Sequence, residues 1–181
     1  MPVDDVITGA TTDALPVAPE LAPTLEAARV PPERSLVDLR VVVISARLGD
    51  EYRGLTASSL VSISLDPPMV LAGLERDSAT RAAVVETRAF NVSLLTRAQE
   101  FIADRFAGRA PSFDPLWRTL PHRLGANGIP LVEDCAAWLE CRLVQVHAAG
   151  DHDICVGEVT AAAMGRGDPL ILWDRTFWTL H

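Results

Sequence analysis

The stretch Trp138-Leu-Glu-Cys-Arg-Leu-Val-Gln-Val146 decides the fold of this chain, because its apolar and polar side chains alternate along it. In an extended backbone Leu139, Cys141 and Leu143 point to one face, and the charged residues between them point to the other. Such alternation is typical of an antiparallel strand that has one face on the core and one face in water. The sequence therefore predicts an antiparallel sheet around this segment.

Further strands are expected on both sides of it. Gly150-Asp151 marks a turn into the next strand. Apolar or alternating runs bounded by turn residues predict strands over Arg40–Ala46, Thr56–Leu65, Met69–Glu75, Phe90–Leu95, His152–Ala161 and Leu170–Trp173. Helices are expected over Ser78–Thr87 and Arg97–Phe106, and a long irregular loop over Pro111–Pro130.

Six or seven strands, mostly linked by turns, favour a closed antiparallel barrel over a doubly wound sheet, which would need a helix after every strand. The expected fold class is mainly β with short helices. The run Arg40–Ala46 is rich in β-branched apolar residues, continuous over Val41–Ile44, so it is expected to be a strand buried on both faces. Because a small barrel leaves large apolar faces, we expect a homodimer.

The length of 181 residues suits one domain with a sizeable core. Residues 1–35 are rich in proline and are expected to form an arm, which leaves 36–181 as the folded domain. No apolar run approaches the roughly 20 residues that a bilayer requires, and no secretory signal is visible, so a cytoplasmic protein without membrane contact is expected. A net charge of -8 and a pI near 4.9 argue against a nucleic-acid partner.

The chain shows none of the dinucleotide, phosphate-loop, hydrolase or metal motifs, and no metal site is expected. Its three cysteines follow no metal-ligand spacing, so buried thiols are expected. A polar cluster remains, Arg53-Gly-Leu-Thr-Ala-Ser-Ser59. Its hydroxyl and amide donors suit a phosphate or the rim of a polar ring. From spacing alone, an edge strand whose Thr and Ser side chains only pair across the sheet is the more common explanation.

Several segments, taken in order, resemble the flavin reductase-like family, whose domain is an FMN-binding split barrel. They span roughly Val41 to Phe177, and each is weak alone, but their shared order is specific. The segments are Gly54-Leu-Thr-Ala-Ser-Ser-Leu, Ser62-Ile-Ser-Leu-Asp-Pro-Pro-Met-Val-Leu, Phe90-Asn-Val-Ser-Leu-Leu, Arg105-Phe-Ala-Gly-Arg, Ala137-Trp-Leu-Glu-Cys, Gly150-Asp-His, Val156-Gly-Glu-Val and Gly167-Asp-Pro-Leu.

The resemblance implies an NAD(P)H:flavin oxidoreductase that reduces FMN or FAD with NADH or NADPH and supplies reduced flavin to a partner monooxygenase. It implies that His152 positions the nicotinamide as the catalytic residue, and that Ser78, Thr80 and Arg81 bind the flavin phosphate at a helix N-terminus. The full set of cofactor-binding residues that it implies is Arg53, Gly54, Leu55, Thr56, Ala57, Ser58, Ser59, Ser62, Gly73, Ser78, Thr80, Arg81, Phe90, Asn91, His152 and Phe177.

Two positions depart from the family's pattern. Ser93 stands where many members have Asn, and Phe177 replaces a commoner tyrosine, which keeps the stacking face but loses the hydroxyl. Two other functions stay open. The protein could retain its flavin and reduce a ferric chelate or quinone, or it could be a flavin- or haem-binding protein without turnover. Without the resemblance, a histidine just after a turn such as His152 is more often a solvated or capping residue than a catalytic one.

Overall fold

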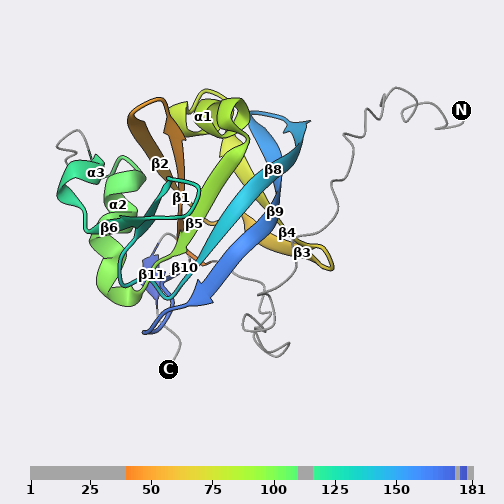
Figure 1. Cartoon of the computed structure of the whole chain (residues 1–181). Coiled ribbons are helices and arrows are strands. Elements are labelled where there is room, and N and C mark those ends of the chain that lie inside the picture. The colour runs from red at the N-terminus through yellow and green to blue at the C-terminus, as the bar shows by residue number, and fades with distance from the viewer. Residues whose placement is uncertain (1–39, 110–115, 174–175, 179–181) are drawn as a thin grey trace, which may run out of the picture.

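The computed structural model describes residues 40–109, 116–173 and 176–178, and the proline-rich arm lies outside them. Most strands belong to one curved sheet (Figure 1). Its strands are β1 (Val42–Leu48), β2 (Glu51–Ala57), β3 (Leu60–Leu65), β4 (Pro68–Glu75), β5 (Ala89–Leu94), β8 (Ala137–Ala149) and β9 (His152–Met164).

Small elements cover the ends and one side of this sheet. β6 (His122–Leu124) pairs with β7 (Pro130–Val132), and β10 (Ile171–Trp173) pairs with β11 (Thr176–Trp178). The helices are α1 (Ala79–Thr87), α2 (Glu100–Phe106), which follows the 3-10 turn η3 (Arg97–Gln99), and α3 (Leu116–Thr119). No helix among these described elements is long and apolar enough to cross a bilayer.

The strand order in the main sheet is β2-β1-β5-β8-β9-β4-β3, and all pairs are antiparallel. The prediction of a mainly β, antiparallel fold with short helices is therefore confirmed. The sheet has two edges, β2 and β3, and no ladder joins them within the described residues. Closure of the barrel is thus not observed. The two edges are instead connected by the chain itself, through Ser58 and Ser59.

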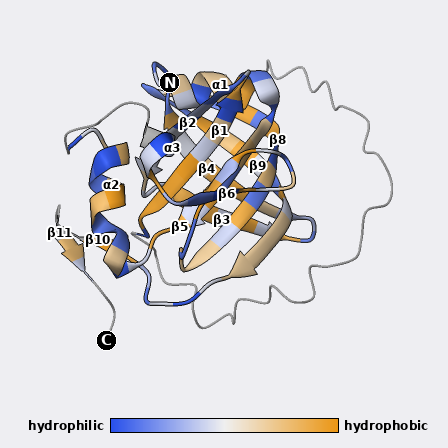
Figure 2. Cartoon of the chain, turned by 60° about the vertical axis from the view of Figure 1, so that its left-hand side comes forward, coloured by the Kyte–Doolittle hydropathy of each residue, from blue (hydrophilic) through white to orange (hydrophobic). Residues whose placement is uncertain are grey.

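The apolar run at the start of β1 contributes side chains to two core clusters. Val42 and Ile44 belong to the core cluster that also contains α1 residues, whereas Val41 and Val43 belong to a second cluster with residues of α2 and α3. Because successive side chains of a strand point to opposite faces, only a run without polar residues can fill both clusters. The prediction of a strand buried on both faces is confirmed. In Figure 2 several strands carry both orange and blue segments, so apolar and polar residues are mixed along them.

Three boundaries differ from the prediction. The expected strand Thr56–Leu65 is broken at Ser58–Ser59, where the chain passes from one edge of the sheet to the other. The expected loop over 111–130 contains α3 and β6, and the final strand is followed by β11. These elements have three or four residues each, too few for a periodic pattern to be visible.

All three cysteines are buried and free, as expected. Burial raises the pKa of the Cys135 and Cys141 thiols, and it raises the pKa of Cys155 to about 11. The thiols are therefore protonated at neutral pH and act as small apolar side chains in the core.

Candidate active site

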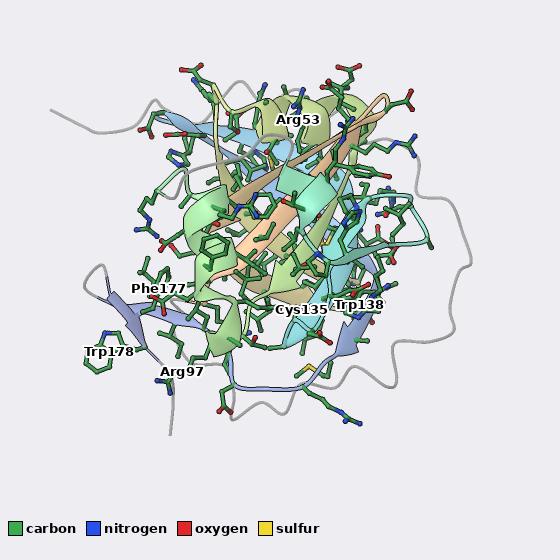
Figure 3. The ribbon with its side chains drawn as sticks, turned by 90° about the vertical axis from the view of Figure 1, so that its left-hand side faces the viewer. Arg53, Arg97, Cys135, Trp138, Phe177 and Trp178 are labelled. Carbon is green, nitrogen blue, oxygen red and sulfur yellow. The ribbon has the colours of Figure 1, made fainter. Side chains whose placement is uncertain are left out.

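A pocket of about 280 Å³ lies where β2 ends, and it is close to the lower limit of ligand pockets. It brings together Thr56, Ala57 and Ser58 of the hydroxyl segment with Phe177 of β11, which is more than a hundred residues away in the chain. Val41, Ala107, Arg109 and Leu172 complete its lining. Figure 3 shows Phe177 toward the body of the protein and Trp178 directed away from it.

The hydroxyl groups of this segment have different partners. Thr56 Oγ1 donates to the carbonyl oxygen of Ala103 at 2.7 Å, so it ties β2 to α2. Ser59 Oγ is bound to the backbone of Gly73 in β4. It accepts from the N–H of Gly73 at 3.1 Å and donates to the carbonyl oxygen of Gly73 at 3.0 Å. Ser58 lies between them, is exposed and lines the pocket. It is the serine best placed to bind a ligand in the pocket.

His152 lies on the other side of Ser59. A Cβ placed on Gly73 would be 3.3 Å from Ser59 Oγ and 3.9 Å from Cδ2 of His152, so the three residues are neighbours. The Nδ1 of His152 is 2.8 Å from Oδ1 of Asp151, and this hydrogen bond holds the pKa of Asp151 below its usual value. The neighbouring carboxylate orients the imidazole, which remains 44% exposed.

The N-terminus of α1 lies next to this histidine. Ser78 caps the helix, because its Oγ accepts from the backbone N–H of Arg81 at 3.1 Å. Arg81 binds Asp153, and Nε of Arg76 donates to the other carboxylate oxygen of Asp153 at 3.0 Å. Burial alone would raise the pKa of Asp153, but hydrogen bonds from the two arginines outweigh it and lower the pKa. The carboxylate thus holds both guanidinium groups at the helix N-terminus, where anions are favoured.

Four residues of the expected set pack or pair on strands outside the pocket lining. A Cβ on Gly54 would lie 2.7 Å from Cε1 of Phe106, so this glycine allows aromatic packing against β2. Leu55 packs on the first core cluster, and Arg53 forms an ion pair with Glu51. Ser62 is exposed on the edge strand β3.

Three further residues of the set are buried in structural positions. Thr80 is buried in α1, and Phe90 fills the core against Gly157, where a Cβ would lie 2.5 Å from its ring. The amide of Asn91 donates to the carbonyl oxygen of Ile129 at 2.9 Å and exchanges hydrogen bonds with the amide of Asn127. The structure gives these three side chains roles in holding the strands and the 125–129 turn.

The sequence reasoning missed the part of the pocket that comes from the end of α2. Ala107 and Arg109 line it, and the guanidinium carbon of Arg109 lies 5.7 Å from the centre of the Phe177 ring. Both residues belong to the segment Arg105-Phe-Ala-Gly-Arg. Nothing in that segment indicates a contact with a residue near the other end of the chain.

Taken together, the residues fit a planar heterocycle with an anionic tail. The pocket offers apolar and aromatic walls beside hydroxyl and main-chain donors. The capped N-terminus of α1, with two arginines, offers an anion site. Ser59 follows the pocket residue Ser58 in the chain, and His152 pairs with Glu75 just before α1. Flavin nucleotides have both parts.

Comparison with known proteins gives a consistent result. The model of the flavin reductase like domain matches residues 35–181. The chain is 37% identical over 138 residues to an FMN reductase (NADH) of Agrobacterium fabrum, covering 76% of each chain. It is 35% identical over 142 residues to the reductase component of a 4-hydroxyphenylacetate 3-monooxygenase of Thermus thermophilus, covering 76% of this chain and 85% of that protein.

A solved structure extends the similarity to the fold. It is an NADH:FAD oxidoreductase of Streptomyces globisporus in complex with NAD and FAD fragments. The TM-score is 0.72 at 33% identity, and the match covers 78% of this chain and 85% of that one.

Proposed function

The chain belongs to the flavin reductase-like family, and we propose on this basis that it is an NAD(P)H-dependent oxidoreductase that reduces FMN or FAD. Its relatives are FMN and FAD reductases that use NADH, and they include the reductase component of a monooxygenase. We propose that this enzyme likewise supplies reduced flavin to a partner oxygenase.

The pocket that joins the segment Thr56–Ser58 to Phe177 is the observation that carries this function, because it supplies donors and an aromatic wall in one place. When bound, the flavin supplies the hydride-accepting chemistry, and the protein supplies binding and alignment. We assign Ser58 and the main chain of this segment to the ring, and Ser78 with Arg81 to the phosphate. Hydride transfer requires the reacting atoms within about 3–3.5 Å, and His152 is assigned to positioning the nicotinamide.

The test is a mixture of the purified protein with NADH and free FMN or FAD, followed at the nicotinamide absorbance band. Loss of this band in proportion to enzyme supports the proposal. If flavin binds and the band stays unchanged, the protein is a flavin-binding protein without turnover. Repeating the assay with NADPH identifies the preferred donor.

A reductase that supplies reduced flavin to another enzyme must release the flavin quickly. A dissociation constant of about 1 μM corresponds to about -8 kcal/mol, and with an on-rate near 10⁶ M⁻¹s⁻¹ release takes about a second. The pocket contains the exposed Ser58 and is small, which favours this regime over tight retention. Flavin that remains bound through gel filtration would instead favour an enzyme that reduces a separate acceptor such as a ferric chelate or quinone.

We also propose a homodimer in the cytoplasm. β3 is an edge strand, and it exposes three large apolar side chains, Val61, Ile63 and Leu65, the last at 89%. An apolar edge of this kind is a ready template for pairing with another chain. We further propose that the sheet closes into a split barrel. The support for this is that Ser58 and Ser59 connect its two edge strands, β2 and β3.

A further inference from the structure

Arg109 contributes a positive charge to the pocket lining, beside neutral residues. Its guanidinium lies over the ring of Phe177, 5.7 Å from the ring centre, and its Nε is 3.2 Å from Oδ1 of Asp104. The side chain is 48% exposed. A cation that borders the pocket and can still be reached from solvent is therefore available to an incoming ligand.

A second cationic position lies at the N-terminus of α1, and it is the one assigned to the flavin phosphate. Arg76 and Arg81 share the buried carboxylate of Asp153 at the N-terminus of α1. Figures 1 and 2 both show α1 at one end of the molecule and the β10–β11 pair, which carries Phe177, at the other. A reductase must bind two phosphate-bearing nucleotides, and the two cationic positions lie at separate ends of the site.

We propose that Arg109 binds a phosphate group of the nicotinamide nucleotide, an inference that rests on the proposed function. The flavin ring is assigned to the pocket and its phosphate to the α1 end, so Arg109 at the border of the pocket remains for a phosphate of the electron donor. The planar guanidinium of Arg109 suits phosphate geometry and also stacks on aromatic faces.

The contacts of Arg109 fit a residue that exchanges partners. Its ion pair with Asp104 is partly exposed on both sides, and pairs of this kind are weak. The face of Phe177 that the guanidinium covers is also the surface on which a flat heterocycle would stack. Binding of the donor therefore replaces Asp104 by a phosphate and frees the aromatic face.

The experiment compares the wild-type chain with Arg109→Gln and Asp104→Asn. Dissociation constants are measured by calorimetry for NAD⁺ on flavin-saturated protein and by fluorescence for FMN and FAD, and the KM for NADH is measured in parallel. In Arg109→Gln the NAD⁺ dissociation constant and the NADH KM should rise about tenfold, the usual weight of a hydrogen bond to a charged group. Flavin affinity should fall much less, because Arg109 only borders the pocket assigned to the flavin ring. Asp104→Asn should leave donor affinity unchanged or increase it, since Arg109 then has no competing carboxylate.

The different responses of the two variants separate ligand binding from a structural role. If both variants weaken NAD⁺ binding alike, Arg109 only anchors the end of α2 and the inference is overturned. It is also overturned if Arg109→Gln weakens FAD binding and leaves NAD⁺ binding intact. Arg47→Gln is the matched control, because Arg47 forms a comparable exposed ion pair with Asp50 and does not line the pocket. A wild type that oxidises no NADH would refute the proposed function instead, and calorimetry with NAD⁺ would still decide the role of Arg109.

Discussion

Substitution of Gly54 by alanine tests whether this glycine serves packing or flavin binding. The new Cβ would lie 2.7 Å from Cε1 of Phe106, about 0.7 Å closer than ordinary contact at 3.4 Å, and 3.1 Å from Cζ2 of Trp117. Both rings are buried, so the strain is expected to cost about 1–3 kcal/mol. Reduced freedom of the unfolded chain offsets about 0.4–1 kcal/mol of this cost. We expect a net loss of about 0.5–2 kcal/mol, or about 2–6 °C in Tm.

The assay is thermal unfolding together with flavin titration, and Gly73→Ala is the matched comparison. A Cβ on Gly73 would lie 3.3 Å from Ser59 Oγ, so only that side chain must shift by a few tenths of an ångström. Gly73→Ala should therefore change Tm little and weaken flavin binding, whereas Gly54→Ala should lower Tm and affect flavin binding less. A Gly54→Ala variant with unchanged Tm and the larger loss of flavin affinity would refute the reasoning.

Three other predictions concern the site and the edge strand. His152→Ala should raise the KM for NADH far more than the flavin dissociation constant, and equal losses in both would contradict its assigned role. The pKa of Asp153 is lowered in the folded state, so its contribution to stability is present above the ordinary value of 3.8 and is lost as pH falls through the lowered pKa. Asp153→Asn should consequently unfold more easily at neutral pH and show a smaller loss of stability on acidification, which denaturation curves at several pH values would check. Leu65→Lys should shift the protein from dimer to monomer in sedimentation experiments, and an unchanged dimer would show that β3 is not the interface.

The antiparallel β fold could be predicted because the local pattern depends directly on burial. Alternation over Trp138–Val146 correctly indicated a strand, and the apolar run Val41–Ile44 indicated one that is buried on both sides. The expectation that Glu140 faces water was wrong, because its carboxylate is buried and accepts from the backbone N–H of Ala126. The break at Ser58–Ser59 could not be predicted in the same way, because serine is compatible with both a strand and a turn. Three-residue strands such as β6 and β11 were not predicted either, because they are too short to show a periodic pattern.

The sequence by itself determined the mainly antiparallel β class, the longer strands of the main sheet and the burial of β1 and of the cysteines. Each of these depends on residue types that are neighbours in the chain, so a local pattern can express them. Only the tertiary structure decided which of these residues meet. It placed Phe177 and Arg109 beside Thr56–Ser58, and it placed Gly54 and Asn91 in packing and hydrogen-bond networks. The physical reason is that such contacts arise from strand pairing and helix docking between distant segments, which no local spacing records.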